Sequence, residues 1–329
     1  MQRNKDISKL MNEYGKKGIP FLFVIDFDNS APEVFMIEEL RDKGIFADIG
    51  NLQIYPEKSE LPQDIIFQKI PVSFQRYKQA FETAKDYIFR GDSFLLNLTF
   101  PTEIVTNLSL KDIFIHSRAK FKLLYKDRFT VFSPEPFIRI SGNKISSFPM
   151  KGTIDASLQD AGKKIMEDIK EISEHNTIVD LIRNDLSMVA KRVRVDKFRY
   201  IEKVKTHEKE LLQTSSEISG ILPGDRQQNI GDIIFRMLPA GSISGAPKKM
   251  TIQIIKEAEK YERGFFTGIF GYFDGKNLES AVMIRFIEKE GDKMIFKSGG
   301  GITYFSNVED EYNELIDKVY VPIVRNSKD

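Results

Sequence analysis

Apolar positions recur with the period of a helix in several segments of the chain. Residues 74–90 place Tyr77 and Ile88 on one face, and Gly91 follows where a helix is expected to end. The longest helical pattern covers residues 157–186, with isoleucine and valine side chains on one stripe. The same spacing predicts further helices over residues 3–16, 229–237, 248–262 and 308–319.

Shorter apolar runs bounded by turn residues predict strands between these helices. They cover residues 21–25, 33–37, 93–99, 129–132, 136–141, 144–149, 192–204, 216–222, 267–273, 279–287 and 293–298. The strands come in hairpin-like pairs interrupted by long helices, without regular strand–helix alternation. This pattern predicts an α+β fold with mainly antiparallel sheets. Because no proline-rich linker or internal repeat divides the chain, any two halves should share an interface.

The composition is that of a globular protein and excludes several classes of partner. The 329 residues are 41% hydrophobic and 29% charged, and 49 Lys and Arg balance 48 Asp and Glu. A formal net charge of +1 gives no field that would hold a polyanion, so neither nucleic acid nor a membrane surface is expected as the principal ligand. The polar N-terminus lacks an apolar signal region and residues 21–25 are too few to span a bilayer, so we expect a cytoplasmic protein.

The absence of cysteine limits the chemistry that the chain can perform. It excludes disulfides, thiolate metal sites and cysteine nucleophiles. The histidines, His116, His175 and His207, form no pattern typical of zinc sites. Any metal should therefore be bound through oxygen atoms.

Two pairs of glutamates have the spacing that places both carboxylates on one helical face. They are Glu171 with Glu174, in the longest predicted helix, and Glu311 with Glu314, in the last one. Their oxygen atoms suit Mg²⁺, which commonly keeps waters while it bridges to an anionic substrate. Either pair alone is more typical of a solvated helix face, and only the combination of the two favours a metal site.

Two glycine-rich segments lack the patterns of nucleotide-binding loops. Residues 241–248 do not have the spacing and the final Lys-Ser/Thr of a P-loop, and Tyr304 stands where residues 299–301 would need a further glycine. Each segment could bind an anion such as a carboxylate through its backbone amides. Alternatively, the first is simply a loop leading into a helix and the second a strand-to-helix turn.

Three further residues are candidates because of their local sequence. Lys151 lies between a predicted strand and the next helix, where a lysine is usually solvated. If it were buried near other cations, the pKa of its amine would fall and the free amine could act as a nucleophile. Glu135, in the segment SPEP, is either a surface turn residue or, in an apolar pocket, a proton donor. Arg285 lies in the apolar run AVMIRF and is expected to pair with a carboxylate, either of the protein or of a ligand.

Seven short motifs follow one another over about three quarters of the chain, from about residue 74 to 321. They are GDSFLLNL (91–98), SPE (133–135), PMKGT (149–153), EHNTIVDLIRND (174–185), PAGSISGAPK (239–248), GIFGY (268–272) and GGGI (299–302) followed by EYNE (311–314). Together they resemble the chorismate-utilising enzymes, the family of anthranilate, aminodeoxychorismate, isochorismate and salicylate synthases. The resemblance implies a catalytic domain over residues 74–329, with a sandwich-like core flanked by helices and two interwoven subdomains. Residues 1–73 would be a shortened N-terminal region that contributes strands.

The resemblance also implies a site for chorismate and Mg²⁺. The metal would be held mainly by Glu174 and Glu314, with Glu171 and Glu311 in support. The substrate-binding residues implied are Gly299, Gly300, Gly301, Lys318, Arg285, Tyr272 and Ser244. The glycine amides and the lysine would bind the ring carboxylate, the arginine and the tyrosine would bind the enolpyruvyl carboxylate, and the serine lies in a loop of the same pocket. Glu135 matches the general acid that protonates the departing ring hydroxyl.

Two positions indicate which nucleophile is added to the ring. Family members that add water carry a lysine base where this chain has Leu95, and a leucine cannot deprotonate water. Lys151 precedes Gly-Thr as in aminodeoxychorismate synthases, whereas anthranilate synthases typically have alanine there. The implied mechanism is attack of the lysine at ring C2 as the C4 hydroxyl leaves, followed by addition of ammonia at C4 and expulsion of the lysine. The product would be 4-amino-4-deoxychorismate, the precursor of p-aminobenzoate and folate.

Other activities stay open at this point. The chain could be an anthranilate, salicylate or isochorismate synthase, or a non-catalytic chorismate-binding subunit. Ammonia should come from a separate glutamine amidotransferase subunit, because class I amidotransferases use a cysteine nucleophile and this chain has none. Two positions depart from the family: Gln213 replaces a histidine, and Leu95 replaces the glutamine common in amino-transferring relatives. We expect His207 to lie too far along its strand to replace that histidine.

Overall fold

Helices and strands alternate irregularly along residues 2–205 and 210–323, the part of the chain that this computed structural model describes. The helices are α1 (Gln2–Lys17), α2 (Phe74–Phe89), α3 (Leu110–His116), α4 (Ala161–Glu167), α5 (Ile169–Ser187), α6 (Ile230–Arg236), α7 (Gly241–Ser244), α8 (Lys248–Glu259) and α9 (Val308–Asp317). Short 3-10 helices cover Ile37–Glu39 and Arg226–Asn229. None of the described helices combines the length and the apolar character needed to cross a membrane.

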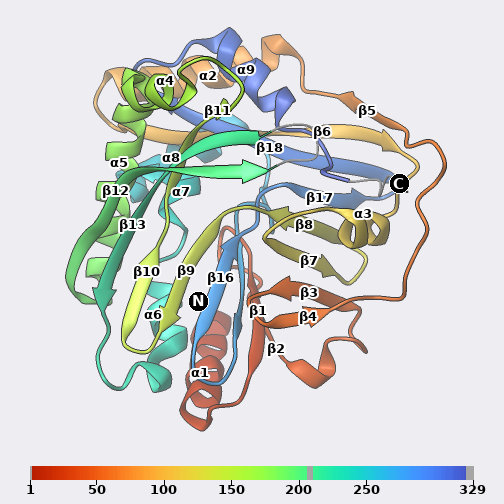
Figure 1. The fold of residues 1–329 in the computed structure, drawn as a ribbon, viewed down its shortest axis with the longest axis vertical. Coiled ribbons are helices and arrows are strands. Elements are labelled where there is room, and N and C mark those ends of the chain that lie inside the picture. Colours follow the sequence, from red (N-terminus) through yellow and green to blue (C-terminus); the bar gives the residue numbers. More distant parts are fainter. Residues whose placement is uncertain (1, 206–209, 324–329) are drawn as a thin grey trace.

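The strands form two nine-stranded sheets (Figure 1). In order, the first sheet contains β11 (Met150–Asp155), β13 (Glu210–Ile221), β10 (Lys144–Ser147), β9 (Pro136–Ser141), β16 (Leu278–Val282), β15 (Ile269–Phe273), β1 (Phe21–Ile25) and β2 (Glu33–Met36), and β12 (Lys191–Lys205) pairs with β13. The second contains β14 (Gly245–Ala246), β6 (Leu95–Thr106), β18 (Lys293–Thr303), β17 (Phe286–Glu290), β8 (Phe129–Ser133), β7 (Phe121–Tyr125), β3 (Ile45–Ile49) and β4 (Leu52–Ile54), and β5 (Phe67–Ile70) pairs with β6. The predicted α+β class with antiparallel sheets is confirmed.

The N-terminal residues are part of both sheets. β1 and β2 extend the first sheet beyond β15, while β3 and β4 lie at the far edge of the second sheet beyond β7. β5 pairs with β6 in the second sheet. The strands that precede α2 are therefore built into the same framework as those that follow it.

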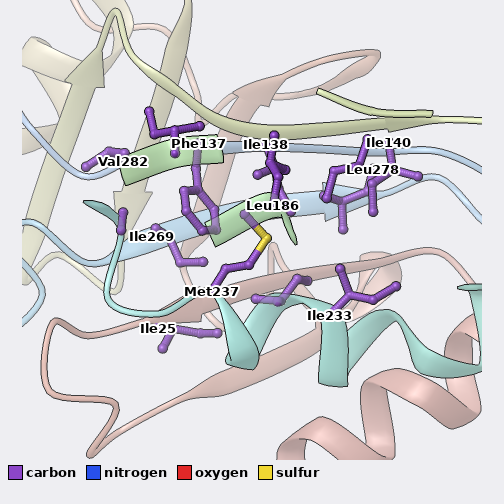
Figure 2. Close-up of a cluster of buried hydrophobic side chains, with 14 of the residues drawn as sticks. Ile25, Phe137, Ile138, Ile140, Leu186, Ile233, Met237, Ile269, Leu278 and Val282 are labelled. Atoms are coloured by element: carbon purple, nitrogen blue, oxygen red, sulfur yellow. The ribbon is translucent and has the colours of Figure 1, made fainter. Parts of the chain in front are cut away.

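Apolar side chains form a core between the sheets and another beneath the helices. Leu22 and Phe270 of the first sheet share one buried cluster with Leu123 of the second. On the other side of the first sheet, a cluster joins β9 and β16 to Leu186 of α5 and Ile233 of α6 (Figure 2). Burial of one such side chain contributes about 1.5–3 kcal/mol, so this cluster fixes α5 on the sheet.

Three predicted elements differ from those observed. The helix expected over residues 157–186 is divided at Asp168, whose side chain accepts a hydrogen bond from the Glu171 amide and caps α5. The strand expected over residues 279–287 is two strands, β16 and β17, which belong to different sheets. Residues 299–301 lie within β18 rather than in a turn.

Candidate active site

Two strands continue from one sheet into the other, and the turn at each crossing carries a predicted site residue. β8 continues into β9 through Pro134 and Glu135, and β16 continues into β17 through a segment that ends at Arg285. The two crossings are hydrogen-bonded to each other through the backbone. The Val282 amide donates to the Glu135 carbonyl, and the Phe132 amide donates to the Arg285 carbonyl, both at 3.1 Å. The fold thus brings an acid and a guanidinium group from distant parts of the sequence to neighbouring positions.

A cavity of about 710 Å³ adjoins these crossings. Helix α5, the start of β11, the end of β18 and helix α9 complete its wall. Predicted site residues in the lining are Glu135, Lys151, Glu171, Glu174, Arg285, Gly299, Gly301, Glu314 and Lys318. Sites for small molecules and cofactors commonly have volumes of about 300–1,000 Å³, so the space suits a metabolite.

Glu135 lies in the cavity wall rather than on a surface turn. It is half-buried and accepts a hydrogen bond of 2.5 Å from the hydroxyl of Ser242. Burial raises the pKa of Glu135, and the opposing effects of Ser242, Lys151, Arg285 and Lys318 do not cancel this. A raised pKa keeps a carboxyl group protonated closer to neutral pH, as a general acid requires.

Arg285 has a backbone conformation that few non-glycine residues adopt. Its φ of +53° lies in the left-handed region, at the point where the chain leaves the first sheet for the second. Its guanidinium lies 5.5 Å from the ring centroid of Tyr320, and its buried Nε has no hydrogen-bond partner among the described residues. Buried donors are normally satisfied, so this arrangement favours the carboxylate of a ligand as the partner of Arg285.

Lys151 lies on β11 beside an irregularity in the sheet. The register between β11 and β13 shifts directly after Lys151, and Gly152 has a φ of +74°. The Nζ atom donates to Oε2 of Glu174 at 3.1 Å. Burial alone would lower the pKa of Lys151, but Glu174, with further contributions from Glu314 and Glu171, raises it. The condition expected to make this amine a nucleophile, nearby cations that lower its pKa, is therefore not met, because its nearest charged groups are carboxylates.

Glutamates from two helices approach the backbone where glycine leaves room for them. A Cβ atom at Gly152 would lie 3.1 Å from Oε2 of Glu171. A Cβ atom at Gly300 would lie 3.2 Å from Oε2 of Glu311 and 3.5 Å from Oε1 of Glu314. Glu311 is 1% exposed and, with Gly300, lies beneath the cavity lining rather than in it.

Lysines lie beside two of these carboxylates. Lys151 contacts Glu174, and Nζ of Lys318 donates to Oε1 of Glu314 at 2.5 Å and to the carbonyl of Gly299 at 2.9 Å. Within the described residues, no group of three or more His, Asp or Glu side chains is arranged to hold a metal ion. Mg²⁺ is usually bound through one or two protein carboxylates together with water and substrate oxygens, and two carboxylates at the cavity fit that requirement.

Two predicted residues lie away from the cavity. Ser244 is fully buried and donates to the carbonyl of Ala240 at 2.9 Å, whereas Ser242, two positions earlier in the same short helix, lines the cavity. Tyr272 is five residues beyond Thr267, which does line it, and a strand advances about 3.3 Å per residue. Tyr272 instead packs against the core between the sheets.

The glycine run lies along the edge of a strand. Gly299, Gly300 and Gly301 are in register with Thr99, Leu98 and Asn97 of β6. On the other side, β17 pairs with β18 only as far as Lys297. Beyond that point this edge of β18 has no partner among the described strands and borders the cavity.

Several residues of the lining were not predicted from the sequence. Lys297 is a buried lysine that donates to the carbonyl of Arg263 at 3.2 Å and is ion-paired with Glu288. Nothing in the pattern around this lysine indicates burial. Ser242 could have been found, since it belongs to the glycine-rich segment already singled out.

The positions that depart from the family pattern lie at or near the site. Gln213 lines the cavity. Three residues further along β13, Ser216 lies 2.6 Å from Nε2 of His175. Burial, with a smaller effect of Arg199, lowers the pKa of His175 to about 4, so this imidazole is neutral at physiological pH. His207 lies outside the described residues.

Comparisons with known proteins show the family and the fold of this chain. The sequence model of a family described as chorismate binding enzyme matches residues 28–323. The chain is 52% identical over 315 residues to an uncharacterized PabA-like protein of Haemophilus influenzae, covering 95% of both chains. It is 30% identical over 265 residues to aminodeoxychorismate synthase component 1 of Bacillus subtilis, covering 76% of this chain and 55% of the relative. The fold is similar to that of the menaquinone-specific isochorismate synthase MenF from Escherichia coli, with a TM-score of 0.74, 16% identity, and 95% and 80% of the two chains covered.

Proposed function

The chain belongs to the family of chorismate binding enzymes, and from this premise we propose that it aminates chorismate with ammonia to give 4-amino-4-deoxychorismate. The observation that carries the proposal is the position of Lys151, whose amine lies in the same cavity as Glu135 and Arg285. A cavity that only bound chorismate would not require a lysine nucleophile and a protonated acid together.

The charges of the cavity suit a dicarboxylate. Chorismate carries a ring carboxylate and an enolpyruvyl carboxylate. We assign the enolpyruvyl carboxylate to Arg285, because the buried Nε of this residue has no hydrogen-bond partner in the described part of the chain. Lys318, which also lines the cavity, and the open edge of β18 would bind the ring carboxylate.

The glutamates supply oxygen ligands for a magnesium ion. Glu174 and Glu314 would hold Mg²⁺, and Glu171 and Glu311 would support them. When bound, the ion would neutralise the ring carboxylate and polarise the ring. Glycine at positions 152 and 300 leaves room for three of these carboxylates, since a Cβ atom there would lie 3.1–3.5 Å from their oxygens.

The covalent step requires the free amine of Lys151. Because Glu174 is the main group that raises the pKa of Lys151, neutralising the charge of Glu174 would favour release of a proton from Nζ. Nζ would then attack C2 of the ring while the C4 hydroxyl departs as water with the proton of Glu135. Ammonia would add at C4, the C2–Nζ bond would break, and the net reaction would convert chorismate and ammonia into aminodeoxychorismate and water.

Leu95 disfavours the addition of water at the same site. The side chain is 3% exposed, and its Cδ1 atom would lie 3.1 Å from a Cβ atom at Gly301. A hydrocarbon at this position has no group that could deprotonate water. This supports amination over isochorismate or salicylate formation.

An exposed aromatic face offers a docking surface for the glutamine amidotransferase subunit. Phe89, Phe94, Tyr304 and Phe305 are 58–63% exposed, which is unusual for a cluster of large apolar side chains. A hollow of about 560 Å³ is lined by Phe94, Tyr304 and Phe305 and by residues of α5, Thr177 among them. α5 also contributes Glu174 to the cavity wall, so this helix borders both the hollow and the cavity.

The first experiment is mass spectrometry of the products that the purified protein forms from chorismate, Mg²⁺ and excess ¹⁵N-ammonium, with an EDTA control. We expect ¹⁵N-labelled 4-amino-4-deoxychorismate only when the metal is present. Lys151→Ala should abolish it, whereas Lys78→Ala, at an exposed lysine of α2, should not. Anthranilate, isochorismate or salicylate as product, or full activity of Lys151→Ala, would overturn the proposal.

A second experiment tests the docking surface. Phe94→Ala combined with Phe305→Ala should reduce glutamine-dependent turnover with the co-expressed amidotransferase subunit and leave ammonium-dependent turnover unchanged. Phe198→Ala, at an aromatic residue that is 53% exposed elsewhere on the surface, is the matched control. Equal glutamine-dependent rates in both variants would exclude this face.

A further inference from the structure

A lysine of α2 occupies the centre of the turn that joins β18 to α9. Nζ of Lys85 donates to the backbone carbonyls of Thr303 at 3.1 Å, Tyr304 at 2.6 Å and Ser306 at 3.2 Å. The same ammonium lies 5.1–5.8 Å from the ring centroids of Phe81, Phe89 and Tyr304. Carbonyl oxygens and aromatic faces are both negative, so six groups converge on one positive charge.

The hydrogen bonds from Lys85 add to those that the turn makes within itself. Within the turn, the Ser306 amide donates to the Thr303 carbonyl at 3.3 Å, the Thr303 amide to the Ser306 hydroxyl at 3.1 Å, and the Phe305 amide to the Thr303 hydroxyl at 3.3 Å. The carbonyls of Tyr304 and Ser306 receive no hydrogen bond within the turn from these donors, and Lys85 supplies one to each. Nζ of Lys85 thus adds three charge-assisted hydrogen bonds to the three that the turn makes itself.

The turn leads directly to the glutamates of α9. Asn307 caps the helix by accepting the amides of Glu309 and Asp310, and Glu311 follows within the first turn. α2 contacts α9 itself where the ring centroids of Tyr77 and Tyr312 lie 5.4 Å apart. α2 thus holds the turn before α9 through Lys85 and the middle of α9 through Tyr77.

We propose that Lys85 is a positioning residue, which fixes the start of α9 and thereby holds the carboxylates of Glu311 and Glu314 against β18. The inference rests on the proposed function only in assigning these carboxylates to Mg²⁺. Lys85 does not line the cavity, so it acts on the site through the turn.

The test compares Lys85→Met with Lys78→Met. Methionine keeps an unbranched stem against the rings and removes the charge, and Lys78 is an exposed lysine of the same helix with 49% of its side chain accessible. Mg²⁺ alone is titrated into each protein by calorimetry, and hydrogen exchange is measured by mass spectrometry for peptides covering residues 303–316. Loss of a residue that orients metal ligands typically costs 10–100-fold in metal affinity. We expect Lys85→Met to raise the Kd for Mg²⁺ about tenfold or more and to accelerate exchange at the start of α9, while Lys78→Met changes neither.

Several results would overturn the proposal. An unchanged Kd for Mg²⁺ in Lys85→Met, with or without faster exchange, would show that the turn does not position the carboxylates. If Lys85→Met does not fold, Lys85→Gln gives the same comparison, because glutamine also removes the positive charge and keeps an unbranched stem. If the unaltered protein does not bind Mg²⁺, the metal of the proposed function is wrong. Hydrogen exchange then tests Lys85 separately: equal exchange rates of α9 in Lys85→Met and Lys78→Met would refute the role of Lys85.

Discussion

Replacement of Ser242 tests whether Glu135 is the proton donor. The serine hydroxyl donates to Oε1 of Glu135 at 2.5 Å, and this bond favours the ionised carboxylate, so it lowers a pKa that burial raises. Ser242→Ala removes the bond, and the pKa of Glu135 rises further. A general acid acts in its protonated form, so its contribution is lost as the pH rises through its pKa. The variant should therefore stay active to a higher pH than the unaltered protein.

The size of this effect follows from the energy of the hydrogen bond. A hydrogen bond to a charged group contributes roughly 1.5–3 kcal/mol. Since 1.36 kcal/mol corresponds to a tenfold change in an ionisation equilibrium, the ratio of protonated to ionised Glu135 should be roughly 10- to 150-fold higher in Ser242→Ala at any given pH.

The assay is kcat for amination of chorismate across the neutral and alkaline range. Both proteins are compared at equal concentrations of free ammonia, so that the titration of ammonium cancels. Ser187→Ala, at an exposed serine of α5 that donates to the carbonyl of Arg183, is the control and should leave the profile in place. An alkaline limb that does not move in Ser242→Ala, or that moves to lower pH, would refute the assignment of Glu135 as the acid.

Three further substitutions test the packing of the site and the stability of the fold. Gly301→Ala would place a methyl group 3.0 Å from Nζ of Lys151. Displacement of the amine should reduce kcat by up to about 100-fold in steady-state assays. An unchanged kcat would contradict the role of Lys151 as the nucleophile. Asp185→Asn breaks the 2.7 Å ion pair between Asp185 and Lys248, in which the two side chains are 7% and 19% exposed. The free energy of unfolding, measured in urea, should fall by about 3 kcal/mol, and a loss near zero would contradict this. Burial alone would raise the pKa of Glu33, but hydrogen bonds from its lysine and tyrosine partners lower it, so its contribution is present at neutral pH and lost in acid. Glu33→Gln should therefore lower the free energy of unfolding by about 0.5–1 kcal/mol at neutral pH and leave it unchanged at acidic pH. Equal losses at the two pH values would exclude the ion pair as the cause.

Local patterns in the sequence predicted elements whose shape depends on neighbours along the chain. The apolar stripe of residues 74–90 predicted α2 closely, because a helix that buries one face must repeat with its own period. The break in the predicted helix over residues 157–186 also had a local signal. Asp168 stands three residues before Glu171, a spacing typical of a helix start, and its side chain does accept the Glu171 amide.

The sheet crossing at Arg285 had no such signal. Val282 and Phe286 are both fully buried, and a run of apolar residues looks the same whether one sheet or two bury it. The change of sheet needs a left-handed residue, which is usually glycine, but here it is an arginine. Only the partners of the two strands, β9 and β8, decide that the run is divided.

The electrostatics of the site likewise could not be predicted from local sequence patterns. The type of residue at position 151 indicated a nucleophile, but the pKa of its amine depends on glutamates that α5 and α9 bring from far along the chain. Ser242 and Ser244 are two positions apart in one short helix, so they point in different directions, and the sequence alone favours neither.

The position of the acid and the guanidinium group follows from the way the two sheets are joined. A strand that leaves one sheet for another interrupts its own hydrogen-bond ladder, and buried amides must then find other partners. Here the two crossings satisfy each other through the Val282–Glu135 and Phe132–Arg285 bonds. Because these bonds involve only the backbone, they fix the two residues without using their side chains. The carboxyl and guanidinium groups are thus held at a rigid point of the framework and are left to the cavity, where preorganised charge is most effective for catalysis.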